Sequence, residues 1–215
     1  MALLSNSFDH VRQALELLYY ISGIVIAIAA IRGLRQLTIT RDISRENAKR
    51  EAYKLAADEC RHFAQDIVPL GTTLHNHINE KNIQSFAHPS FVVTRGEIEK
   101  HNFNLMILQK EIPIITLDLI TYLNAMEAFA IFFASGVAAE EIGYRETGTS
   151  FCSAVERYMP AVWAMRQVNV RYESTVRLYE IWHARQEAEK ISKQMKALEE
   201  AAKRLPKETI KPIGT

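Results

Sequence analysis

The side chains best suited to chemistry in this chain are the histidines of a His-x-His pair, His75 and His77, which follow Cys60 and His62. Imidazole and thiolate groups are common zinc ligands. The apolar residues of this segment recur with helical spacing, however, and residues two apart on a helix point about 200° apart. His75 and His77 therefore cannot share one ion unless the helix breaks, and we expect solvated histidines there.

A second group of polar side chains interrupts an apolar helix expected to begin at Pro113 and to run through Ser135. Asp118, Asn124 and Glu127 drift along one side of it. Metal or acid chemistry in a bundle requires a second acidic helix, usually with Glu-x-x-His, and we find no helix pair of this kind. Because unpaired carboxylates are costly in a core, we expect all three to be buried and paired. The expected partners are arginines of the last helix, namely Arg157, Arg166 and Arg171.

The remaining nucleophiles lack a catalytic context. Cys60 and Cys152 lie far apart among apolar neighbours, are typical of small core residues, and fit a reducing compartment. Ser150 and Ser153 have no Gly-x-Ser-x-Gly motif around them, and the chain has no glycine-rich phosphate loop. We therefore predict no catalytic residue, no cofactor and no metal ligand, and we interpret the protein as a non-enzyme.

The segment that dominates the chain is an uncharged apolar run from Leu17 to Ile31, LLYYISGIVIAIAAI. A bilayer core requires about 20 apolar residues, and residues 14–34 meet that length. Basic residues follow the run directly: Arg32, Arg35, Arg41 and Arg45. Since Lys and Arg concentrate on the cytoplasmic side of a span, we expect a single-pass anchor in the inner membrane with the rest of the chain in the cytoplasm.

Two other interpretations of the apolar run remain open. Glu16 and Gly23 weaken the span, so the run also fits a buried or interfacial helix of a soluble core. Ala27-Ile28-Ala29 resembles a signal-peptidase site, although the preceding segment is not basic. The arginines that follow the run are also suited to binding anionic lipid head groups.

Composition favours one helical domain behind the anchor. The 215 residues include only 8 Gly and 6 Pro, and 26 Lys and Arg against 25 Asp and Glu leave a net charge of +1, which argues against nucleic acid as a partner. The fold class expected is all-α, with an N-terminal transmembrane helix, a cytoplasmic helical bundle and a long C-terminal helix. The expected divisions are 1–13 outside the membrane, the anchor at 14–34, the bundle at 35–182, a charged helical extension at 183–205 and a flexible tail at 206–215.

Within the bundle, helical spacing is expected from Thr40 to about Asn79, with Pro69 and Gly71 placed to kink it. A loop or short extended segment is expected over 83–95, and a short helix over 97–109. Gly136 should stop the apolar helix, which is too interrupted by Asp118 and Glu127 to be a second span. A short helix over 138–144, a break over 145–150 and a last helix from Phe151 to about Leu205 complete the expectation.

Several short motifs of the second half resemble a domain-of-unknown-function family of small bacterial helical proteins. These are Tyr122-Leu-Asn-Ala-Met-Glu-Ala-Phe-Ala-Ile, then Gly136-Val-Ala-Ala-Glu-Glu, and the aromatic- and Arg-bearing stretch from Phe151 through Arg166 to Tyr172-Glu173. The resemblance covers mainly 119–182. It implies an all-α protein that is often tethered to the membrane by one N-terminal helix, and it assigns no activity.

The C-terminal helix carries an apolar seam of coiled-coil type. Its positions alternate steps of three and four: Ile181, Ala184, Ala188, Ile191, Met195, Leu198, Ala202 and Leu205. Ile191, Met195 and Leu198 are its largest members beyond the bundle, and the flanking residues are charged with both signs. The seam either packs back on the protein's own bundle or joins it to a protein partner or a second copy.

These patterns predict a membrane-tethered interaction protein: a scaffold, adaptor or accessory subunit of a membrane-associated complex. One alternative is a bacterial stress or phage-response effector that perturbs the membrane after it oligomerises. The other is a hydrolase or nuclease with an unrecognised site, which would require titratable side chains gathered in a hollow.

Overall fold

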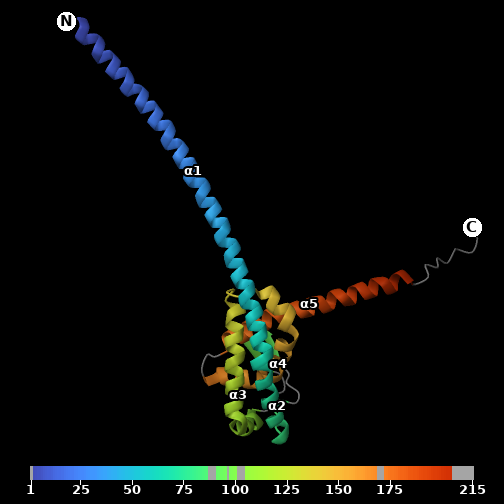
Figure 1. Ribbon diagram of the computed structural model, residues 1–215. Helices are drawn as coiled ribbons and strands as arrows, with labels where there is room; N and C mark the ends of the chain where they lie inside the picture. The colour runs from blue at the N-terminus through green and yellow to red at the C-terminus, as the bar shows by residue number, and fades with distance from the viewer. Residues whose placement is uncertain (1, 87–90, 96, 101–104, 169–171, 205–215) are drawn as a thin grey trace, which may run out of the picture. The chain divides into compact units, whose positions relative to one another are not determined.

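The computed structural model describes residues 2–86, 91–95, 97–100, 105–168 and 172–204, without the side chains of 2–21, 24–28, 99–100, 105–106, 168 and 204. The chain is mostly helical, as predicted for an all-α protein. Its elements are α1 (Ala2–His62), a π-helical turn η1 (Phe63–Ile67), α2 (Val68–Glu80), β1 (Phe91–Thr94), β2 (Glu97–Lys100), α3 (Leu105–Ala134), α4 (Glu140–Val168) and α5 (Glu173–Arg204). Figure 1 shows their arrangement.

The chain divides into two compact units, residues 1–51 and 52–215. The first is the N-terminal part of α1, whose backbone is helical throughout the apolar run. Most side chains of that run lie outside the described residues. After it, Ile31 and Leu34 are exposed, and the hydroxyls of Thr38 and Thr40 donate to the backbone carbonyls of Leu34 and Gln36. The helix therefore satisfies its own polar groups without help from a neighbour.

Proline explains the π-helical turn that separates α1 from α2. Pro69 has no N–H for the carbonyl of residue 65, and its ring crowds that carbonyl. Just before Pro69 the helix makes one wider, π-helical turn, in which the Val68 N–H donates to the Phe63 carbonyl, five residues back. The predicted irregularity at Pro69 thus takes the form of a π turn, and the buried face continues through it: Ala56, Phe63, Ile67, Leu74 and Ile78.

α3 is the central helix of the second unit and contacts α2, α4 and α5. Among the residues searched, it is the one helix long and apolar enough to cross a membrane, over Ile107–Ala134. Length and composition alone are weak evidence for a span, because the core helix of a soluble bundle passes the same test. Leu119, Met126, Phe129 and Phe133 are buried inside the unit, and we interpret α3 as such a core helix.

An aromatic cluster forms the densest part of this core. The Trp182 ring of α5 is fully buried between Phe133 of α3 and Tyr144 and Phe151 of α4, with ring centroids 5.2–6.0 Å away. Its indole N–H donates to Glu140 at 2.6 Å, so the one polar atom of the ring is satisfied. The cluster fixes the first turns of α5 against α3 and α4.

Three of the predicted boundaries are wrong. The segment expected as a helix over 97–109 begins as a strand, because Glu97–Lys100 pairs antiparallel with Phe91–Thr94, and α3 starts at Leu105. Pro113 lies inside α3 rather than at its start, and the helix breaks locally at Ile115, whose φ is −122° and ψ is 15°. The expected end of this helix is confirmed, since Gly136 adopts a φ of +74° directly after it.

The third wrong boundary is the break expected over 145–150. α4 runs through it without interruption, and a separate helix α5 begins only at Glu173, after Tyr172 with a φ of +61°. Gly148, the one glycine of the expected break, lies inside the helix, where a Cβ would be 2.9 Å from the Tyr144 ring. One turn earlier the Phe133 ring lies against Gly143, where a Cβ would overlap it. Thr147 is buried and donates to the Gly143 carbonyl at 2.8 Å, so its hydroxyl is satisfied within the continuous helix.

Candidate functional site

The polar side chains of α3 meet neighbouring helices, but none of their recorded partners is an arginine. Asp118 Oδ2 lies 2.7 Å from His77 Nδ1 of α2, and Asn124 accepts a hydrogen bond from the Tyr172 hydroxyl at 3.3 Å. Glu127 accepts from the backbone N–H groups of Ser174 and Thr175, at 3.0 and 2.8 Å. It also accepts from the Thr175 hydroxyl at 2.7 Å.

These contacts correct two expectations. Asn124 is exposed and Asp118 and Glu127 are half-buried, so the three residues are not a buried stripe. The arginines named as partners lie elsewhere: Arg157 and Arg166 are on α4, and Arg171 lies outside the described residues. The physical reason is that the first turn of α5 has unsatisfied N–H groups and positive potential, so Glu127 is stabilised there without a cation.

His75 and His77 contact different residues, consistent with their positions on a helix. His77 contacts Asp118, whereas His75 lies 3.4 Å from Arg157 and 3.1 Å from Asn79. Across the described residues, no group of three or more His, Cys, Asp or Glu is placed to hold a metal ion. Cys152 is buried and Cys60 is partly buried, and both are free thiols.

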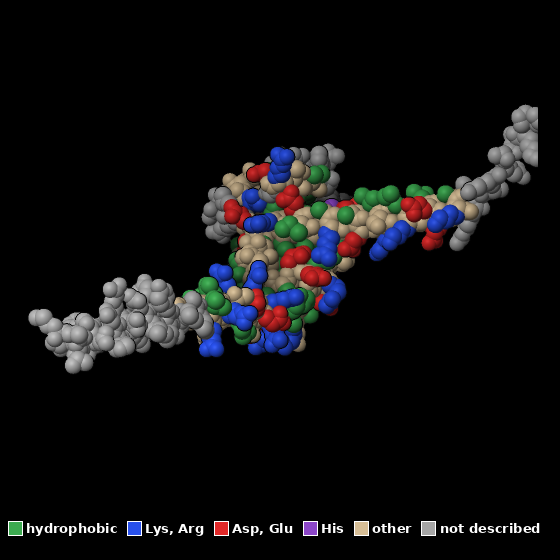
Figure 2. Space-filling view, turned by 90° about the horizontal axis from the view of Figure 1, so that it is seen from above, with side chains coloured by type: hydrophobic (Ala, Val, Ile, Leu, Met, Phe, Trp, Pro, Cys, Tyr) green, Lys and Arg blue, Asp and Glu red, His purple; other side chains and the backbone are tan. Residues whose placement is uncertain are grey.

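The seam of α5 lies on its outer side. Thr175, Leu178 and Trp182 are buried, whereas Ile191, Met195 and Leu198 are 54%, 57% and 70% exposed. At about 100° per residue, the three seam positions lie roughly 140–180° around the helix from Trp182. Within the described part of the chain the seam is therefore not covered by the protein's own bundle. Figure 2 shows green side chains along one edge of the projecting helix and charged side chains along the other.

The basic residues Arg32, Arg35, Arg41 and Arg45 are exposed on α1. They spread around the helix rather than along one stripe, since their positions differ by 3, 6 and 4 residues. Their charge is thus presented in several directions. This distribution suits a helix surrounded by lipid head groups on all sides better than a helix that docks one face on a protein.

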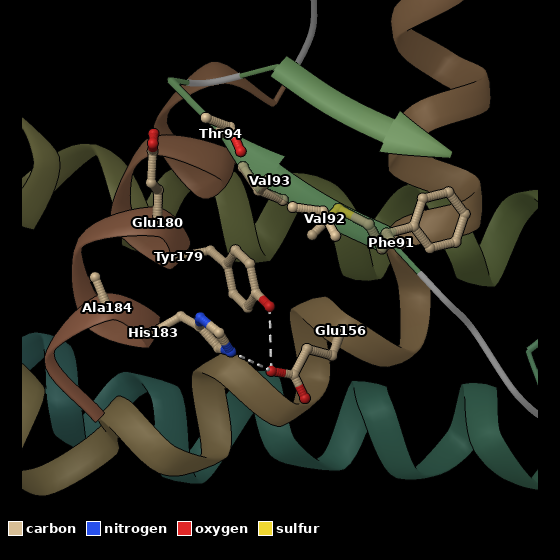
Figure 3. Close-up of a pocket in the computed structure, with 10 residues that line it drawn as sticks. Phe91, Val92, Val93, Thr94, Glu156, Tyr179, Glu180, His183 and Ala184 are labelled. Carbon is tan, nitrogen blue, oxygen red and sulfur yellow. Dashed lines mark hydrogen bonds and ion pairs between the residues drawn. The ribbon is translucent and has the colours of Figure 1, made fainter. Parts of the chain in front are cut away.

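A hollow of about 540 Å³ lies between β1, the first strand of the β1–β2 hairpin, and the helices α4 and α5 (Figure 3). Phe91 and Val93 of β1 and Met159 of α4 contribute apolar walls. On the α5 side, the Tyr179 ring stacks on the His183 ring with centroids 5.2 Å apart. Glu156 of α4 accepts a hydrogen bond from the Tyr179 hydroxyl at 3.1 Å and lies 3.6 Å from His183 Nε2.

This arrangement fixes the imidazole of His183 at the edge of the hollow. Burial and the neighbouring Glu156 carboxylate raise the pKa of Tyr179, so that its hydroxyl remains a donor. Glu180 points away from His183 in Figure 3, and its carboxylate accepts from the Arg95 N–H at 2.5 Å. The hollow thus holds one carboxylate–imidazole pair that is capable of moving a proton, with an apolar wall opposite.

Sequence reasoning missed this group. The signal that points to it is the spacing of Tyr179 and His183, which lie four residues apart on one helical face. Glu180-Ile-Trp-His183 is a Glu-x-x-His motif, but the Glu180 carboxylate binds the Arg95 N–H and does not belong to the group. What the sequence did not indicate is that Glu156 of α4 would meet Tyr179 and His183, because α4 and α5 were expected to be one continuous helix.

The sequence matches no protein-family model, no curated protein and no solved structure. The resemblance to a family of small bacterial helical proteins therefore stays a prediction.

Proposed function

We propose that this protein is a membrane-tethered interaction protein whose copies associate through the exposed seam of α5. Residues 14–34 anchor it in the inner membrane, with the N-terminus outside and the second unit in the cytoplasm. The observation that carries the proposal is the heptad-spaced apolar seam at Ile191, Met195 and Leu198, on a part of α5, residues 188–203, whose described side chains are all exposed. Isolated exposed apolar residues are ordinary, whereas a stripe at heptad spacing is typical of a helix with a partner helix.

A second copy of the chain is the partner that this seam fits best. With Ile191 and Leu198 at position d and Met195 at position a, Glu187 and Gln194 take position g, and Ser192 and Glu199 take position e. In a parallel pair, position g of one helix faces position e of the next heptad of the other. Glu187 then faces Ser192, and Gln194 faces Glu199, so neither contact joins like charges. An anchor orients all copies alike, which selects the parallel pairing and raises the local concentration of seams.

The thinness of the seam sets the expected strength of this association. Alanine occupies three of its positions, so the buried area per heptad is small and the pair should dissociate once the chain leaves the membrane. Ile191→Asp combined with Leu198→Asp should abolish the assembly, because a charged side chain is not tolerated unpaired in the seam. Chemical crosslinking in intact membranes, followed by denaturing electrophoresis, should show a dimer for the wild type and a monomer for the variant. Glu189→Ala with Lys196→Ala, off the seam, is the control.

The anchor has an independent test. Protease added to spheroplasts should leave the chain after Arg32 intact, and carbonate or salt washing should not release it. Release by washing, or digestion from outside, would contradict the proposed anchor or its orientation without bearing on the seam.

A second candidate function is enzymatic, and the Glu156–His183 pair in the hollow favours it. An imidazole 3.6 Å from a carboxylate, beside a hollow of this volume, is a candidate general base. The full chain in detergent should then hydrolyse some member of a panel of esters and phosphodiesters, and His183→Gln should remove that activity while the fold remains. Absence of turnover by the wild type, or turnover unchanged in His183→Gln, would rule against this candidate.

A further inference from the structure

A second hollow, separate from the one at His183, opens between α2, α3 and α4 and has a volume of about 320 Å³. Its rim carries side chains that donate hydrogen bonds, and its floor is aromatic. The lining residues used below are Arg157, His75, Ser150, Ser153, Tyr122 and Tyr158.

The rim is positive and bears hydroxyl groups. Arg157 Nη1 of α4 lies 3.4 Å from His75 Nδ1 of α2, and Ser153 and Ser150 are one and two turns away on the same helix. Of the described residues that line the hollow, none is Asp or Glu. The recorded contacts of the Arg157 guanidinium are with His75 and with Tyr158, not with a carboxylate. A guanidinium placed in this way has donors left for an anionic ligand.

The floor is aromatic. Tyr122 and Tyr158 are buried, with ring centroids 5.2 Å apart, and Phe63 is buried as well. Gly71 of α2 permits the close approach of Tyr122, because a Cβ at residue 71 would lie 2.9 Å from the Tyr122 ring. A ligand with an apolar or aromatic portion would therefore rest on the rings while its anionic group reached the rim.

We propose that this hollow binds a phosphate-bearing ligand, with the phosphate held by Arg157 and the esterified group against Tyr122 and Tyr158. The planar guanidinium matches the geometry of two phosphate oxygens, and its hydrogen bond to His75 Nδ1 orients it at the rim. The serine hydroxyls supply further donors along α4. The phosphate belongs either to a soluble phosphomonoester or to a lipid head group, and both present the same chemistry to the rim.

The test uses the full chain in detergent micelles, and the first probe is phenyl phosphate measured by titration calorimetry. The second probe is short-chain phosphatidic acid added to the same micelles, compared with phosphatidylcholine of the same chain length, because the proposed anchor would carry the chain into any vesicle. Arg157→Gln should weaken binding by about tenfold or more, the usual effect of losing a charge-assisted hydrogen bond. Arg145→Gln, an exposed arginine on the same helix that pairs with Glu146, should bind as the wild type does.

Each outcome supports or overturns the proposal. Saturable phenyl phosphate binding that depends on Arg157 identifies a soluble ligand, and dependence on Arg157 for phosphatidic acid alone identifies a lipid head group. If Arg157→Gln fails to fold, Ser153→Asp replaces it, since residue 153 is exposed and its new carboxylate would repel phosphate. Binding of neither probe by the wild type, or binding unaffected by Arg157→Gln and Ser153→Asp, would overturn the proposal, and neither result depends on the α5 seam.

Discussion

At the scale of single residues, two carboxylates of α3, Glu111 and Glu127, are stabilised by backbone N–H groups and a neighbouring hydroxyl. Glu127 accepts from the first turn of α5, and Glu111 accepts from the N–H groups of Gln84 and Ser85 and from the Ser85 hydroxyl. Helical periodicity predicted which positions of α3 carry polar groups. It did not identify their partners, because those partners lie on other segments, whose boundaries and packing against α3 the spacing does not report.

Glu127→Ala should destabilise the protein by about 2 kcal/mol, the upper range for losing a helix N-terminal cap. The reason is that three donors of Ser174 and Thr175 lose their acceptor at once. Chemical denaturation of the purified chain, monitored by the circular dichroism signal of the helices, measures this change in the free energy of unfolding. Glu200→Ala on the exposed end of α5 should change the free energy of unfolding by under about 0.5 kcal/mol. Equal stability of the two variants would contradict the capping role.

The lowered pKa of Glu111 predicts that the stability of the protein depends on pH. Burial alone would raise its pKa, but the hydrogen bonds from Ser85 and Gln84 outweigh burial and hold the pKa below the ordinary value of 4.5. A group whose pKa is lower in the folded protein stabilises the fold above its unfolded pKa. This contribution should be complete above pH 4.5 and lost as the pH falls through the lower folded value. The denaturation midpoint of Glu111→Gln should fall less steeply than the wild type below pH 4.5, and parallel curves would refute this.

At the scale of elements, the fold class and the long helices followed from sparse Gly and Pro and from three- and four-residue spacing. The β1–β2 hairpin and the uninterrupted course of α4 could not be predicted from these patterns. Glycine is an ambiguous signal: Gly136 adopts a positive φ and ends α3, whereas Gly143 permits the close approach of Phe133 within a helix. Spacing along one segment does not distinguish these two roles, because the second depends on a neighbour from a distant part of the chain.

Gly143→Ala should therefore destabilise the second unit, by about 1–3 kcal/mol for an overpacked core. The added Cβ would overlap the Phe133 ring, which is itself packed against Trp182. Gly33→Ala is the matched control, since nothing lies within 4 Å of a Cβ built there and alanine favours the helix. Thermal unfolding should show a lower midpoint for the Gly143→Ala protein and an unchanged or higher one for the Gly33→Ala protein. A Gly143→Ala protein as stable as the Gly33→Ala protein would argue against this packing.

At the scale of the whole molecule, the two features that underlie the proposed function were both visible in the sequence as patterns. The apolar run defines the proposed anchor, and the heptad spacing defines the seam. The structure adds that the seam lies away from the packed face of α5, which the sequence alone left undecided. The sequence did not predict the hollows at His183 and Arg157. Each is lined by several elements, and the spacing of residues along one helix does not indicate how that element packs against the others.

The most direct test of the central claim is disulfide crosslinking of Met195→Cys in native membranes. Lys193→Cys is the matched control, because residue 193 lies on the side of α5 that carries Trp182, about 20° around the helix from it. The parallel seam predicts a dimer for Met195→Cys, no dimer for Lys193→Cys or the wild type, and loss of the dimer when Ile191→Asp and Leu198→Asp are added. A Met195→Cys protein that remains monomeric, or one that crosslinks no better than Lys193→Cys, would contradict assembly through α5.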